Sequence, residues 1–167
     1  MSVPPGDRGV STMQFIETAR TIERRAMQIC RRWAKSWFFF ITQRTVNLAS
    51  SIYEHAQKAN AIFPIMTEDE RTERVLELER ALGALYAFAQ KIELAYSLFP
   101  ICGEKKDVSH SEKEEKSNRL FEELMNLCLD EEEALTGNLH WTRTAELGGK
   151  TAKKNDNKPP GEQGTNL

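Results

Sequence analysis

The chain has 167 residues, a length that suits a single domain. Hydrophobic residues make up 40% and charged residues 29%, a balance typical of a soluble helical protein that argues against a membrane-spanning or fully disordered chain. The net charge of −2 hides a segregation: residues 1–67 carry +5, residues 68–133 carry −9 and residues 134–167 carry +2.

Proline and glycine are concentrated at the two ends of the chain. Between residues 10 and 147 the only such residues are Pro64, Pro100, Gly83, Gly103 and Gly137. This scarcity leaves little room for a turn-rich β-fold and provides no glycine-rich phosphate-binding loop. We predict a flexible arm over residues 1–10, a helical domain over residues 11–144 and a disordered tail over residues 145–167.

The first predicted helix spans residues 11–32, with Ser11 or Thr12 as its N-cap. Its apolar stripe repeats every three or four residues and consists of Phe15, Ala19, Ile22, Ala26, Ile29, Cys30 and Trp33. The second predicted helix spans residues 36–62, and Pro64 ends it. Its stripe consists of Ile41, Thr45, Leu48, Ile52, His55, Ala59 and Ile62. Residues 33–36 contain neither Gly nor Pro. The first two segments are therefore either separated by a bend there or joined in a single long helix.

A capping box, Thr67 to Glu70, begins the third predicted helix, and Pro100 with Gly103 ends it. Its stripe keeps heptad spacing through Leu78, Leu82, Leu85, Ala89, Ile92, Tyr96 and Phe99. A second capping box, Ser111 to Glu114, begins the fourth helix, which runs to Trp141 with Gly137 as an earlier candidate stop. Its stripe is Leu120, Leu124, Leu127 or Cys128, Glu131 and Leu135. Four amphipathic helices with short connections predict an all-α, antiparallel up-down four-helix bundle.

Motifs for catalysis or metal binding are missing from these helices. No Glu-x-x-His pair of the di-iron type occurs, and the spacing of Asp107 and His110 falls in a predicted loop. We interpret His55 as a half-buried structural histidine and the acidic run 130–133 as a solvated helix face. The sequence therefore predicts a non-enzyme without catalytic residues, metal or cofactor.

Cysteine usage and the lack of a leader predict the cytoplasm. Cys30, Cys102 and Cys128 are odd in number and far apart, as expected of reduced thiols. Residues 1–10 lack the apolar stretch of a signal peptide, and the longest apolar run, residues 37–41, is too short to span a bilayer.

A basic ridge is the first feature that suggests a partner. The cations step along one side of the first helix and continue into the second, and they are Arg20, Arg24, Arg25, Arg31, Arg32, Lys35 and Arg44. Such a ridge can neutralise the phosphates of a nucleic acid, through contacts to backbone and shape. The alternative is a solvated face that pairs with acids of the third or fourth helix.

A run of aromatic residues is the second such feature: Trp37, Phe38, Phe39 and Phe40. Consecutive helical residues point around most of the circumference, whereas a bundle core covers one stripe. Some of these side chains should therefore face another subunit or a partner protein. The alternative is that the preceding segment folds back and covers them.

The stretch from Phe38 to Pro64 resembles the second helix of a bacterial four-helix-bundle family. Further similarity lies in residues 80–85, 90–99 and 124–137, and together these cover roughly residues 16–143. The family is the accessory variability determinant of diversity-generating retroelements, related in fold to the proteins encoded by intervening sequences of bacterial large-subunit ribosomal RNA. This chain reads Arg32-Trp-Ala-Lys35 where the family has a Phe-Pro-Lys-type break, and its net charge is lower.

The resemblance implies a barrel-like homopentamer of four-helix bundles. It also implies binding to the retroelement's reverse transcriptase and its template-repeat RNA, in support of mutagenic, adenine-directed cDNA synthesis. Family members are not themselves catalytic. A scaffold that binds protein through its acidic third and fourth helices, with no nucleic-acid role, is the alternative function.

Overall fold

The structure, a computed structural model, describes residues 13–33, 35–98, 110–145 and 147. Within these residues it contains no strand and four α-helices: α1 (Gln14–Cys30), α2 (Gln43–Ala61), α3 (Glu68–Leu98) and α4 (His110–Thr144). Two short irregular helices, the 3₁₀ turn η2 (Lys35–Trp37) and the π-helical turn η3 (Phe38–Thr42), lead into α2. The predicted arm, the N-caps Ser11 and Thr12, and residues 148–167 of the tail lie outside the described residues.

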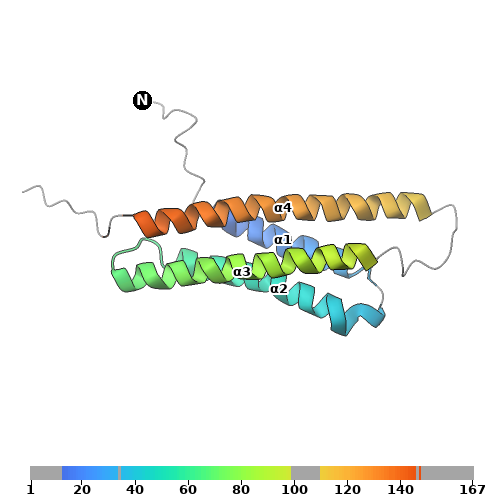
Figure 1. The fold of residues 1–167 in the computed structure, drawn as a ribbon, viewed down its shortest axis with the longest axis horizontal. Coiled ribbons are helices and arrows are strands. Elements are labelled where there is room, and N and C mark those ends of the chain that lie inside the picture. The colour runs from blue at the N-terminus through green and yellow to red at the C-terminus, as the bar shows by residue number, and fades with distance from the viewer. Residues whose placement is uncertain (1–12, 34, 99–109, 146, 148–167) are drawn as a thin grey trace, which may run out of the picture.

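The four helices lie side by side in a bundle (Figure 1). Helix α1 packs against α2 and α4, and α3 packs against the same two helices. The α1–α2 edge of the bundle therefore lies opposite the α3–α4 edge. Near one end of the bundle, Arg74 of α3 bonds to Ala59 of α2 and Thr142 of α4. Near the other, the rings of Tyr96 and Phe121 meet, with centroids 5.1 Å apart.

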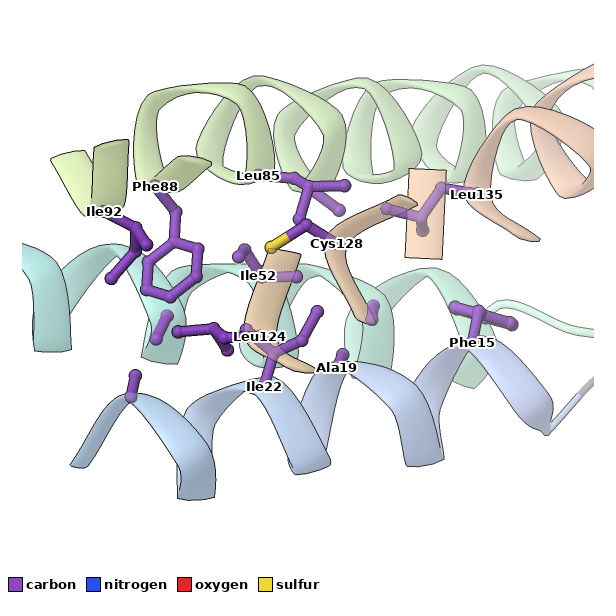
Figure 2. Close-up of a cluster of buried hydrophobic side chains, with 14 of the residues drawn as sticks. Phe15, Ala19, Ile22, Ile52, Leu85, Phe88, Ile92, Leu124, Cys128 and Leu135 are labelled. Atoms are coloured by element: carbon purple, nitrogen blue, oxygen red, sulfur yellow. The ribbon is translucent and has the colours of Figure 1, made fainter. Parts of the chain in front are cut away.

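The predicted stripe of the first helix is confirmed, because every one of its members from Phe15 to Trp33 is buried. Most of the second stripe is buried too, with Leu48, His55 and Ile62 half-buried at its margins. Side chains from all four helices meet in this core, as Figure 2 shows for Ile22 of α1, Ile52 of α2, Leu85 of α3 and Leu124 of α4. Burial of such side chains provides the main stabilisation of the fold.

The predicted stripe of the third helix is partly wrong. The core takes Ala81, Phe88 and Ala95, whereas Leu82 and Ala89 are half-buried and Tyr96 is 47% exposed. Residues 81–89 are apolar on nearly every side of the helix, so heptad spacing can start at either of two neighbouring positions. Packing against α2 and α4 decides between them. Phe99 lies outside the described residues.

Helix α1 ends before the predicted residue 32, and α2 is a separate helix. The amides of Arg32 and Trp33 donate to carbonyls three residues back, at Ile29 and Cys30, instead of four. This tightening ends the α-helix without Gly or Pro. The alternative of one continuous helix is therefore wrong. Helix α4, in contrast, is longer than predicted. It continues through Gly137 to Thr144, so Gly137 does not stop it.

The capping box that begins α3 is confirmed. The Glu70 amide donates to Thr67 Oγ1 over 3.2 Å, and the amides of Met66 and Thr67 donate to Glu70 Oε2 over 2.8 and 2.9 Å. These backbone bonds, that of Met66 foremost, lower the pKa of Glu70. The second predicted box, Ser111 to Glu114, lies outside the described side chains.

The variant Thr67→Ala is expected to lower the free energy of unfolding by about 1 kcal/mol, because it removes an N-cap acceptor. Urea unfolding followed by circular dichroism measures the change. Thr72→Ala is the matched control: its Oγ1 donates to the Glu68 carbonyl inside the helix, where alanine is favoured. Equal effects of the two substitutions would contradict the cap.

Candidate nucleic-acid and partner interface

The cations of the predicted ridge lie on α1, on the turns after it and at the start of α2. Six of the seven are exposed: Arg20, Arg24, Arg31, Arg32, Lys35 and Arg44. Residues 24–53, which we call the cationic segment, contain six Lys or Arg residues and no Asp or Glu. A segment with cations alone produces a local positive potential, which attracts polyanions.

Arg25 differs from the other six, because it contacts an acid of α4. Its Nη2 lies 3.7 Å from Oε2 of Glu123, and its Nη1 donates over 3.3 Å to Oε1 of Gln28. Among the ion pairs formed by the described residues, this is the one that involves the ridge. Pairing with the fourth helix, the alternative predicted for the whole ridge, thus applies here to Arg25.

The aromatic run divides between core and surface. Trp37 is half-buried and packs against the core, with its ring centroid 6.0 Å from that of buried Trp33. Phe39 is 73% exposed and Phe40 is 77% exposed, whereas Ile41 next to them is buried. The side chain of Phe38 lies outside the described ones. The preceding segment therefore covers Trp37 and leaves Phe39 and Phe40 at the surface, with exposed Lys35 and Arg44 four residues before and after them in sequence.

A polar cluster joins α2 to α3 at His55. Its Nδ1 lies 2.6 Å from Oε2 of Glu77, whose Oε1 accepts a bond of 2.5 Å from Arg80 Nη1. Burial raises the pKa of Glu77, but the bonds and charges of His55 and Arg80 outweigh burial and leave it lowered. The interpretation of His55 as half-buried and satisfied is confirmed. Sequence spacing missed Glu77 because it lies 22 residues away on another helix.

Arg74 forms a buried contact that the sequence analysis did not identify. Its side chain is fully buried, and it donates from Nε to Thr142 Oγ1 over 3.1 Å and from Nη1 to the Ala59 carbonyl over 2.7 Å. Its guanidinium carbon lies 5.5 Å from the ring centre of Phe63 and 5.9 Å from that of Trp141. Burial lowers the pKa of Arg74. These contacts hold the α2–α3 connection against the end of α4.

Glu131 is buried, so the interpretation of the acidic run 130–133 as a solvated face is wrong at this position. Its place in the apolar stripe of the fourth helix is confirmed, one turn from buried Cys128 and Leu135. Neither carboxylate oxygen has a hydrogen-bond partner among the described residues. Burial raises the pKa of Glu131 to about 9, so the side chain is protonated at neutral pH.

The thiols of Cys30 and Cys128 are free and buried, as predicted, whereas Cys102 lies outside the described residues. Burial raises the pKa of each to about 12, with a further contribution from Glu131 at Cys128, so neither is a nucleophile at neutral pH. Across the described parts of the chain, no group of three or more His, Cys, Asp or Glu is arranged to hold a metal ion. No described helix is both long and apolar enough to cross a bilayer.

Exposed cations next to exposed aromatic rings are therefore the surface most suited to a partner. The buried polar residues Arg74 and Glu131, in contrast, are enclosed within the bundle.

The chain matches no protein-family model, no curated protein and no solved structure.

Proposed function

We propose that this chain is a non-catalytic, cytoplasmic accessory protein of a diversity-generating retroelement. It binds the reverse transcriptase and the template-repeat RNA and supports mutagenic cDNA synthesis, as a homo-oligomer of up-down four-helix bundles, by resemblance a pentamer. The observation that carries the RNA-binding role is the cationic segment, with six cations, no acid and five of the six side chains exposed. The retroelement role rests on the family resemblance.

RNA contact in this proposal is made to the phosphate backbone. Arginine forms paired, charge-assisted hydrogen bonds with phosphate oxygens, and its charge displaces counterions from the nucleic acid. The exposed cations Arg24, Arg31, Arg32, Lys35 and Arg44 supply these contacts together with Arg20. Arg25 contributes less because Glu123 already contacts it.

The triple variant Arg24→Ala, Arg31→Ala and Arg32→Ala is expected to weaken binding to a fluorescein-labelled structured RNA. The slope of log K against log salt concentration should become shallower by about 2, since each lost phosphate contact removes about 0.7 to 0.9. Fluorescence anisotropy over a series of KCl concentrations measures this slope.

The matched control removes the same charge from α3 and α4, through Arg80→Ala, Arg119→Ala and Arg143→Ala. These three side chains are exposed and form ion pairs with Glu77, Glu123 and Glu79. Their removal should leave the slope nearly unchanged. An unchanged slope in the triple variant of Arg24, Arg31 and Arg32 would overturn the phosphate contacts.

The second candidate is an oligomeric scaffold that binds proteins and no nucleic acid. The contact between Arg25 and Glu123 favours it, because this one cation of α1 pairs with an acid of α4 and is less available to a polyanion. This scaffold would be supported if the ultraviolet absorbance ratio of the purified protein shows no bound nucleic acid and the protein still captures the reverse transcriptase. An adjacent reverse-transcriptase gene with two near-identical repeats would support the retroelement role in either case.

A further inference from the structure

We infer that copies of this chain associate head to tail, with Phe39 and Phe40 of one copy seated in a groove between α3 and α4 of the next. This inference rests on the oligomer of the proposed function, but requires neither RNA nor a reverse transcriptase. It assigns two different surfaces of one molecule to a single interface.

The first surface projects from η3. Phe39 and Phe40 are 73% and 77% exposed, more than any other large hydrophobic residues that the structure describes. Exposed Lys35 and Arg44 flank them in sequence, and no acid occurs within residues 24–53. A pair of exposed aromatic rings with a positively charged rim is typical of a contact centre, because aromatic residues, Phe included, are enriched in the buried core of interfaces.

The second surface is a groove of about 490 Å³ between α3 and α4. Its apolar lining includes Ile92, Tyr96, Phe121 and Met125, and the rings of Tyr96 and Phe121 meet edge to face. Among the described residues that line it, Glu93 and Glu122 are the charged ones, and both are exposed. The groove thus offers an apolar floor with a negative rim, the complement of Phe39 and Phe40 with their positive rim.

The two surfaces cannot meet within one molecule. In the bundle, η3 leads into α2 on the α1–α2 edge, and the groove lies on the opposite α3–α4 edge. Figure 1 shows the η3 segment on the side of the bundle away from α4. An interface between unlike surfaces on opposite edges is heterologous. Each copy contacts one neighbour through Phe39 and Phe40 and the other neighbour through its groove, so the assembly forms a ring or an open chain.

A mixing experiment tests the inference on nuclease-treated protein, by size-exclusion chromatography with light scattering. The ring variant carries Phe39→Ser and Phe40→Ser, and the groove variant carries Tyr96→Arg and Glu122→Arg, all at exposed positions. Each variant alone should be monomeric. Their equimolar mixture should form a heterodimer, since one intact surface of each kind remains.

The control variant Met66→Ser with Leu76→Ser changes two exposed apolar residues at the far end of the bundle, and should keep the wild-type mass. A mixture that stays monomeric, or a wild-type protein that is itself monomeric, overturns the inference. So does a ring variant that keeps its oligomeric mass and loses RNA affinity, which would assign the rings to RNA.

A charge exchange covers the case in which the ring or groove variant does not fold. Arg44→Glu alone should weaken assembly through repulsion from Glu93 and Glu122, and Glu93→Arg with Glu122→Arg in the same chain should restore it. Absence of both effects contradicts the inference. The RNA salt slope is measured separately, so failure of head-to-tail assembly and failure of the RNA role are distinguishable.

Discussion

Replacement of Arg74 by alanine is expected to lower the free energy of unfolding by about 3 to 4 kcal/mol. The variant loses two hydrogen bonds from a charged donor and leaves the Ala59 carbonyl and the Thr142 hydroxyl with one partner fewer. It also empties the space beside the rings of Phe63 and Trp141, which contact each other. Truncation of a large buried side chain commonly costs about 2 to 5 kcal/mol. Because the contacts join α2, α3 and α4, the loss should affect the whole bundle cooperatively.

Urea unfolding monitored by tryptophan fluorescence measures this loss, and Trp141 reports on the site directly. The matched control is Arg143→Ala, which removes an exposed arginine from the same end of α4 and breaks its 2.5 Å contact with Glu79. An exposed ion pair contributes about 0 to 1 kcal/mol, so this variant should remain close to wild type. A loss below about 1 kcal/mol for Arg74→Ala would show that the site relaxes without it.

The variant Glu131→Gln is expected to become progressively more stable than wild type as pH rises from 5 to 8. Below a pH of about 4.5 Glu131 is protonated in both the folded and the unfolded chain. Between about 4.5 and about 9 only the unfolded chain ionises it, so unfolding releases a proton and wild-type stability falls by about 1.4 kcal/mol per pH unit. At pH 7 the cumulative cost to the wild type is about 3 kcal/mol.

Glutamine keeps the size and polarity of protonated Glu131 and cannot ionise, so the difference between the two proteins isolates this proton. Urea unfolding of both proteins at several pH values between 4 and 8 gives the slope. Glu133→Gln is the matched control. Glu133 lies two residues after Glu131 on the same helix but is exposed, so this variant should show no such slope. A pH-independent difference for Glu131→Gln would mean that the side chain ionises in the folded bundle.

Features that depend on one clear apolar stripe or on a short local motif were predicted from the sequence. The stripe of α1 was recovered because only one side of that helix is apolar, and the start of α3 because Thr67 and Glu70 form a local motif. The core register of α3 was not recovered, because its residues 81–89 are apolar on nearly every side and fit two registers. Only packing against the neighbouring helices selects Ala81 and Phe88 for the core.

The buried polar residues escaped prediction for a related reason. Partners of Arg74 lie 15 and 68 residues away, at Ala59 and Thr142, so no local pattern contains them. Glu131 sits in an acidic run whose other members are at least partly exposed, and its burial depends on how α4 is rotated in the bundle. The exposed cations and rings were predictable from charge and from aromatic density, whereas the groove opposite them requires two helices in contact.

The π-helical turn of η3 has a consequence for how this protein can change. A π-turn holds one more residue than an α-turn, so residues 38–42 contain the equivalent of a one-residue insertion at the start of α2. Loss of a single codon in this segment would restore regular winding and rotate the preceding side chains by about 100° around the helix. Phe39 and Phe40 would then point in another direction while the core residues of α2 stayed in place. An insertion or deletion of one residue is thus a route by which this surface could be turned to another side of the molecule with both aromatic rings retained.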